Sequence, residues 1–195
     1  MNDSREALRL RLRAARDNLS ASEQISAAEA IVDPVLSEIA RNVPERPVRV
    51  VAGYLATQGE LDVRPTLRAL AQSGWTVVLP VCGPKVTMHF APWIPEDKLA
   101  ANRYGIPEPT TDPVPAADID VVIVPGVGFD VDGSRIGHGA GYYDRFFAGC
   151  FSGGHDPFRI GVAHDLQIVK LPKPEPWDVG MHSVITPSGV ISVDG

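Results

Sequence analysis

The first part of the chain places apolar residues at the spacing of one helical face. They recur every three or four positions up to residue 19, and arginines occupy the opposite or flanking face. Ser20 and Glu23 then have the spacing of a capping box, which predicts that a second helix starts there. The apolar seam of the first helix consists of Leu8, Leu12, Ala15 and Leu19.

We expect the second helix to run from Ala21 to Ile39, with a possible kink at Pro34. Its apolar positions again follow the helical period, so one side should pack on the rest of the protein. These positions are Ile25, Ala28, Val32, Val35 and Ile39.

Beyond residue 47 the pattern changes to short apolar runs between turns. Residues 48–54, 75–80 and 86–90 are predicted strands, and a short helix opens at Pro65 and ends at Gly74. Strand, helix, strand with short links indicates a parallel α/β sheet. Ligands bind such sheets beyond the carboxyl ends of the strands, so the loop carrying Gln58 and Glu60 lies at a candidate rim.

The second half repeats this alternation. Residues 121–124 are four consecutive β-branched residues, which predicts a buried strand. A glycine-rich loop and a helix follow, and residues 159–163 are a further predicted strand. Residues 165–169 read as a short strand or turn, and residues 184–191 as a terminal hairpin.

Three glycines in the loop after residue 124 suggest a phosphate cradle. Gly137, Gly139 and Gly141 leave the backbone N–H groups uncovered, and the following helix directs its positive end at the same place. The loop region also carries Arg135, His138, Asp144 and Arg145. The alternative reading is an ordinary tight connection between a strand and a helix.

Composition narrows the function classes. The chain has 195 residues, an apolar fraction of 44% and a net charge of −6, which is typical of one ordinary domain and argues against a general nucleic-acid binder. Cys82 and Cys150 form no C-x-x-C motif, so a reducing cytoplasm is the expected location. No apolar run is long enough to span a membrane, and the histidines lack the spacing of a structural zinc site.

The arginine-rich first helix leaves three interpretations open. The arginines could form a solvated basic face, an arm for nucleic acid or membrane, or a pair of contacts to an anionic ligand held elsewhere. Glu60 likewise is either a surface acid or a receptor for the paired N–H groups of a polar ring. Spacing along the sequence does not choose between these alternatives.

Residues 124–145 read V-P-G-V-G-F-D-V-D-G-S-R-I-G-H-G-A-G-Y-Y-D-R and resemble the glycine motif of the 5-formyltetrahydrofolate cyclo-ligase family, also called methenyltetrahydrofolate synthetases. The resemblance covers nearly the whole chain. It implies a three-layer α/β/α fold with a mainly parallel sheet in one domain. It also implies ATP- and Mg²⁺-dependent conversion of 5-formyltetrahydrofolate to 5,10-methenyltetrahydrofolate with release of ADP and phosphate.

The resemblance assigns roles to residues of this chain. It implies catalytic roles for Arg135, Tyr143 and Asp144, with Asp144 as the magnesium ligand. The implied ATP-binding residues are Arg5, Arg9, Arg135, Ile136, Gly137, His138, Gly139, Ala140, Gly141, Tyr142 and Tyr143. The implied substrate-binding residues are Leu55, Glu60, His138, Gly139, Ala140, Gly141 and Tyr142. The substrate could be polyglutamylated, and we expect no nucleic-acid or membrane partner and a monomer or weak homo-oligomer.

Two positions depart from the family pattern. Trp177 stands where histidine is common, and His182 stands where a second magnesium-associated aspartate is expected. Magnesium would then be held by Asp144 with ATP and water, or Asp178 would substitute, or the activity would be weak. A paralogue that binds folate or nucleotide without efficient turnover is therefore the alternative function, and an RNA-associated protein is a more distant one.

Overall fold

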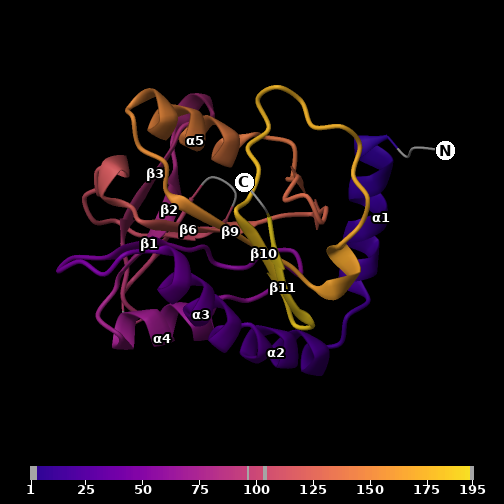
Figure 1. Ribbon diagram of the computed structural model, residues 1–195, viewed down its shortest axis with the longest axis horizontal. Coiled ribbons are helices and arrows are strands. Elements are labelled where there is room, and N and C mark those ends of the chain that lie inside the picture. Colours follow the sequence, from indigo (N-terminus) through magenta and orange to yellow (C-terminus); the bar gives the residue numbers. More distant parts are fainter. Residues whose placement is uncertain (1–3, 96, 103–104, 194–195) are drawn as a thin grey trace.

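The computed structural model describes residues 4–95, 97–102 and 105–193. Within them a seven-stranded sheet has the order β11-β10-β9-β6-β1-β2-β3 (Figure 1). The five inner strands run parallel, and β3 and β11 pair antiparallel at the two edges. The strands of this sheet are β1 (Val50–Ala52), β2 (Thr76–Cys82), β3 (Met88–Pro92), β6 (Val121–Pro125), β9 (Phe158–Val162), β10 (Ser183–Thr186) and β11 (Gly189–Ser192).

Helices cover both faces of the sheet, which confirms the three-layer α/β/α prediction. Figure 1 shows α2, α3 and α4 on one side and α5 on the other, with α1 apart from both groups, where it packs on Val127 and Ile136. The helices are α1 (Arg5–Asp17), α2 (Ala21–Ala30), α3 (Val32–Asn42), α4 (Arg64–Gln72) and α5 (Tyr142–Ser152). Short 3₁₀ turns are η1 (Pro84–Val86), η2 (Ala116–Asp118) and η3 (Asp165–Gln167), and two small ribbons are β4 (Ala100–Ala101) with β5 (Pro107–Glu108) and β7 (Gly128–Phe129) with β8 (Arg135–Ile136).

Each face of the sheet has its own apolar core. On the α2–α4 side, Val51 and Ile123 pack with Leu67 of α4, and on the α5 side Val122 and Phe129 pack with Phe147. A third, smaller cluster lies beneath α1 and consists of Leu8, Leu12, Val127 and Ile136. Because β1 and β6 are buried on both faces, their sequences are continuously apolar rather than alternating.

The expected single helix over residues 21–39 is wrong. The chain forms two helices, α2 and α3, that meet at Ile31. Because of this break, Pro34 falls in the first turn of α3, where its missing N–H is not needed. Ile25 is 61% exposed instead of facing the core, whereas Ala28, Val35 and Ile39 are buried as expected.

Other local predictions are confirmed or corrected. The capping box of Ser20 and Glu23 is present, and the terminal hairpin forms as β10 and β11. Residues 165–167 form a 3₁₀ turn, which confirms the turn and not the strand as the structure of this segment. No helix among the described residues has the length and apolarity needed to cross a membrane.

Candidate functional site

A cavity of about 1200 Å³ opens beyond the carboxyl ends of the central strands. Its walls include Tyr54 and Leu55 after β1, Pro125 at the end of β6, and the loop that leads into α5. The chain continues from β1 to β2 on one side, whereas β6 continues to β9 on the other. The cavity therefore lies where the direction of strand order reverses, which is the usual ligand position in an open α/β sheet.

The predicted glycine loop forms one wall of this cavity. Gly139 and Gly141 have positive φ angles of 106° and 74°, and Gly141 is the N-cap of α5. Residues with a Cβ rarely adopt this backbone conformation, so the sequence requires glycine here. The carbonyl of Ala140 accepts a hydrogen bond from Arg145, which holds the loop against the helix. The exposed start of α5 favours an anion at this wall.

Arginines of α1, which is far from the glycine loop in sequence, also lie at this cavity. Arg5 and Arg9 line the cavity, and Nε of Arg9 donates to the carbonyl of Gly137 at 2.9 Å. Burial lowers the pKa of Arg9, and the neighbouring charges of Arg5 and Arg13 lower it further. An anion in the cavity would relieve this repulsion. Of the three interpretations of the arginine helix, the arrangement favours contact with an anionic ligand.

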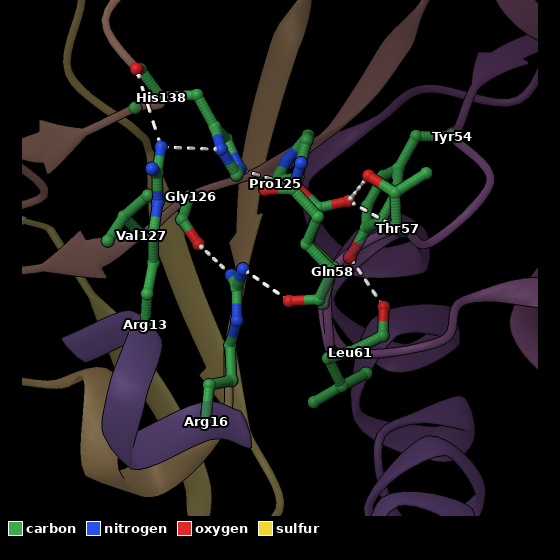
Figure 2. A network of polar contacts seen from close by, with 12 residues as sticks. Arg13, Arg16, Tyr54, Thr57, Gln58, Leu61, Pro125, Gly126, Val127 and His138 are labelled. Carbon is green, nitrogen blue, oxygen red and sulfur yellow. Dashed lines mark hydrogen bonds and ion pairs between the residues drawn. The ribbon is translucent and has the colours of Figure 1, made fainter. Parts of the chain in front are cut away.

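His138 connects α1 to the loop after β1. Nη2 of Arg13 lies 2.9 Å from Nδ1 of His138, and Nε2 of His138 lies 3.0 Å from Oε1 of Glu60. Figure 2 shows Arg13 approaching His138 from α1. Since a guanidinium only donates, Nδ1 must accept, and we infer that the proton is on Nε2 and is donated to Glu60.

Glu60 is fixed as a hydrogen-bond acceptor. Its Oε2 accepts from the backbone N–H of Thr57 at 2.9 Å and from the Thr57 hydroxyl at 3.2 Å, while Oε1 faces His138. Tyr54 braces the loop by donating to the carbonyl of Leu61 at 2.6 Å (Figure 2). A carboxylate offers about four acceptor sites. Glu60 therefore retains capacity to accept from N–H groups of a ligand.

Arg135, Tyr143 and Asp144 form a compact group beside the glycine loop. Nη2 of Arg135 donates to Oδ1 of Asp144 at 2.9 Å, and the guanidinium lies 5.6 Å from the centre of the Tyr143 ring. Burial, together with the charge of Glu60, raises the pKa of Tyr143. Its hydroxyl therefore stays protonated and can act as a donor.

The loop of residues 171–180 closes over this group. The carboxylate of Asp178 pairs with Arg5 of α1, and the N–H of Val179 donates to Oδ1 of Asp144 at 3.3 Å. Burial raises the pKa of Asp178, but the hydrogen bonds from Arg5 and Glu175 and the charges of Arg5 and Arg135 outweigh it and hold the pKa below its usual value. Asp178 therefore remains a carboxylate within the cavity.

His182 does not lie beside Asp144 in this cavity. It stacks on Phe158 with ring centroids 5.0 Å apart, and its Nδ1 accepts from the N–H of Arg159 at 2.9 Å. It lines a second, smaller cavity of about 340 Å³ with Asp120 and His155. His182 therefore does not stand beside Asp144 as the second magnesium-associated position expected from the sequence, because pairing of β10 with β9 places it against Arg159. Among the described residues, no group of three or more histidine, cysteine or acidic side chains is arranged to hold a metal ion.

The structure brings nearly all predicted site residues together. Ile136 is the exception, because its side chain is buried beneath α1 in the cluster with Leu8 and Leu12. The side chains or backbone of the others line the large cavity. These are Arg5, Arg9, Leu55, Glu60, Arg135, Gly137, His138, Gly139, Ala140, Gly141, Tyr142, Tyr143 and Asp144.

Arg16 was not predicted to have a special role. It is fully buried, and its guanidinium donates to the carbonyls of Gln58 at 2.6 Å and Gly126 at 3.4 Å (Figure 2). It therefore joins the loop after β1 to the loop after β6, the two walls of the cavity. The sequence groups Arg16 with the other arginines of the basic face. Only its helical spacing from Leu8 and Leu12 indicates that it lies on the buried face.

Comparison with known proteins agrees with the geometry. The model of the 5-formyltetrahydrofolate cyclo-ligase family matches residues 1–187. The 5-formyltetrahydrofolate cyclo-ligase of Escherichia coli (strain K12) is 38% identical over 145 residues, which is 72% of this chain and 79% of that protein. The 5-formyltetrahydrofolate cyclo-ligase of Haemophilus influenzae is 28% identical over 186 residues, which is 93% of this chain and 96% of that protein.

Solved structures give the same result. The 5,10-methenyltetrahydrofolate synthetase of Aquifex aeolicus superposes with a TM-score of 0.78 at 27% identity, covering 98% of this chain and 94% of that one. The synthetase of Mycoplasma pneumoniae superposes with a TM-score of 0.73 over 95% of this chain and 99% of that one, and at 23% identity it bears on the fold alone. From the family match and the Escherichia coli relative, the chain belongs to the 5-formyltetrahydrofolate cyclo-ligase family.

Proposed function

We propose that the large cavity holds the phosphates of ATP on the glycine loop and the pterin ring of 5-formyltetrahydrofolate beside Glu60. The chain has the activity of its family, conversion of 5-formyltetrahydrofolate to 5,10-methenyltetrahydrofolate. The observation that supports our assignment most is the contact between His138 and Glu60. Through this contact the glycine loop, which would bind the phosphates, lies next to Glu60, which would accept from the ring N–H groups.

The two steps of the proposed reaction need charge neutralisation more than covalent help. The formyl oxygen forms a bond to the γ-phosphorus while the bond from that phosphorus to ADP breaks. The neighbouring folate nitrogen then bonds the formyl carbon and loses its proton, and the carbon–oxygen bond breaks to release phosphate. Both steps move negative charge onto phosphate oxygens.

Fixed donors surround the position where that charge would develop. Arg5 and Arg9 approach from α1 and Arg135 from β8, while the N–H groups at the start of α5 complete the wall. The hydroxyl of Tyr143 adds a neutral donor, because its raised pKa keeps the proton in place. We assign ATP binding to these residues and to the loop from Gly137 to Tyr142.

Folate binding is assigned to the other wall. Glu60 would accept from the N–H pair of the pterin ring, and Leu55 would supply apolar contact beside it. The loop residues from His138 to Tyr142 line the same cavity, and we assign them contacts to both ligands. With both ligands bound in this way, the formyl group would lie near the phosphates.

Asp144 and Asp178 fit a magnesium ion bound together with the nucleotide. Both are carboxylates of the same cavity, and Mg²⁺ prefers such oxygens with several waters and phosphate oxygens completing its shell. The hydrogen bonds to Asp144 from Arg135 and Val179 reach Oδ1, which leaves Oδ2 for an ion. When bound, the ion would neutralise charge on the phosphates. We therefore propose that Asp178 supplies the second carboxylate that His182 does not.

A paralogue without efficient turnover remains the second candidate, motivated by Trp177 and His182 in place of common family residues. The position of His182 weakens this motive, since His182 packs on Phe158 outside the large cavity.

The proposed function is tested by incubating the pure protein with 5-formyltetrahydrofolate, Mg²⁺ and ATP. We expect 5,10-methenyltetrahydrofolate and ADP to appear in equal amounts. Formation of neither product at high protein concentration, with ATP still bound, would support the paralogue instead.

A further inference from the structure

Two exposed aromatic side chains border the large cavity. Trp177 is 68% exposed and Phe151 is 42% exposed, and both line its wall. The other large apolar side chains that are exposed in the described part of the chain, such as Ile94 and Val131, lie outside that wall. Apolar surface that gathers at a cavity mouth indicates a ligand that covers it.

Trp177 is held in a closed turn. The N–H of Asp178 donates to the carbonyl of Glu175 at 3.0 Å, and the N–H of Glu175 donates to the Asp178 carboxylate at 2.8 Å. Arg5 pairs with that carboxylate and so ties the turn to α1. Pro176 restricts the backbone within the turn. The indole is therefore presented to the cavity by a fixed backbone while its own surface stays uncovered.

Phe151 is held in place by contacts with Phe147 and Arg159. Its ring lies 6.4 Å from that of Phe147 at an angle of 17°, and the guanidinium of Arg159 lies 5.3 Å from its centre. It belongs to the last turn of α5, whereas the glycine loop precedes the first turn. The nine residue steps from Tyr142 to Phe151 place it about 14 Å along the helix from the loop.

The position of both rings fits the base of the proposed nucleotide. If phosphates occupy the glycine loop, the base of the nucleotide must lie some way from it along the cavity. Trp177 and Phe151 line the same cavity as the glycine loop and offer apolar surface for the base, whereas we assign Glu60 and Leu55 to the folate. A purine is planar, and aromatic side chains bind bases by stacking without needing paired hydrogen bonds.

We propose that Trp177 stacks on the purine base of ATP, with Phe151 as further apolar surface of the same cavity. This inference rests on the proposed function, since it assumes that the glycine loop holds the phosphates. It gives Trp177 a role in nucleotide affinity. The turn that carries it also includes Asp178, so base and metal would be held by one segment.

Tryptophan fluorescence tests the proposal directly, because the other two tryptophans, Trp75 and Trp93, are only 8% and 7% exposed. Mg²⁺–ATP should quench the fluorescence of the unchanged protein, whereas Mg²⁺–tripolyphosphate, which has no base, should bind without comparable quenching. Trp177→Ala should raise the Kd of ATP about tenfold and leave the affinity for tripolyphosphate unchanged. Trp177→Phe should keep most of the affinity, and Ile94→Ala is the matched exposed control.

Two results would overturn the stacking role. One is an equal Kd of ATP in the unchanged protein and Trp177→Ala. The other is a rise in the KM for 5-formyltetrahydrofolate instead, which would place the folate against Trp177. Both are read from binding or KM and do not depend on the rate of turnover. If the unchanged protein bound neither ATP nor tripolyphosphate, the proposed function itself would fail, and the stacking role with it.

Discussion

Nε2 of His138 lies 3.0 Å from Oε1 of Glu60, although 78 positions separate the two residues in sequence. His138 belongs to the loop that leads into α5, and Glu60 to the loop after β1. The contact therefore joins the wall that we assign to the nucleotide to the wall that we assign to the folate. Because Arg13 donates to the other ring nitrogen, the imidazole has one fixed orientation.

Glu60→Gln should weaken folate binding selectively. The change removes the charge and replaces one acceptor oxygen by an NH₂ group that faces donors. We expect the KM for 5-formyltetrahydrofolate to rise about 10- to 100-fold, from the loss of a charge-assisted hydrogen bond. The KM for ATP should hardly change. Initial rates at varied concentrations of each substrate measure both values, and the exposed Glu29→Gln serves as control. A selective rise in the KM for ATP would show that Glu60 faces the nucleotide.

His138→Ala should be coupled to Glu60→Gln. His138→Ala removes this contact and Glu60→Gln removes its charge, so the double variant should lose less than the sum of the single losses. We expect a coupling free energy of about 0.5–3 kcal/mol in kcat/KM for the folate substrate. A double-mutant cycle measures it. Strict additivity would mean that the contact plays no part in substrate binding.

Arg16→Ala should destabilise the fold more than other arginine substitutions. It leaves the carbonyl of Gln58 without its short hydrogen bond and opens a hole beneath the cavity. We expect the free energy of unfolding to fall by about 2–4 kcal/mol, measured by urea denaturation. Arg68→Ala, on the exposed side of α4, should change it by less than about 0.5 kcal/mol. Equal effects of the two changes would show that the buried guanidinium is not needed.

The magnesium requirement should depend on Asp144 and Asp178. Asp144→Asn and Asp178→Asn should each raise the Mg²⁺ concentration that gives half-maximal turnover by about tenfold or more. His182→Asn should leave it unchanged, because His182 lies in the other cavity. Titration of turnover with Mg²⁺ at saturating ATP separates the three variants. If only His182→Asn changed the Mg²⁺ concentration for half-maximal turnover, His182 and not the two aspartates would lie beside the metal.

Two histidines, the buried His164 and the half-buried His182, should make stability depend on pH. Burial lowers the pKa of His164 and of His182, and the charges of Arg16 and Arg159 lower them further, against the opposing charges of Asp165 and Asp156 and a backbone hydrogen bond of His164 with Gly59.

The contribution of the two histidines to stability follows from their lowered pKa values. In the unfolded chain a histidine gains its proton near pH 6.5, whereas in the folded protein it does so only at lower pH. The stabilisation is therefore complete above about pH 6.5 and is lost as the pH falls from there through the folded pKa. Urea unfolding between pH 8 and 5 should show this fall. It should be smaller in His182→Asn and unchanged in the exposed control His89→Asn. A free energy of unfolding that is constant over this range would contradict the account.

Local signals explain why much of the site could be predicted. The apolar run before Pro125, the glycines from 137 to 141 and the start of α5 are contiguous, so their structure depends mainly on neighbouring residues. The position of Glu60 could be predicted as the carboxyl-end edge of the sheet, because the carboxyl ends of parallel strands meet at one edge.

Long-range packing explains the failures. Arg16 is buried because two carbonyls from distant loops converge on it, which no spacing along α1 reveals. His182 turns away from the glycine loop because β10 pairs with β9 and sets it against Arg159. Both α2 and α3 pack against α4, and the apolar spacing of the sequence continues past Ala30, so spacing alone did not reveal the break.

The transfer of the formyl oxygen tests the central claim most directly. We propose that the formyl group lies beside the phosphates of ATP, so this oxygen should end in the released phosphate. Turnover of 5-formyltetrahydrofolate labelled with ¹⁸O in the formyl group should yield phosphate that carries one ¹⁸O atom for each methenyl product. Unlabelled phosphate, with the label released as water, would contradict phosphoryl transfer in this cavity.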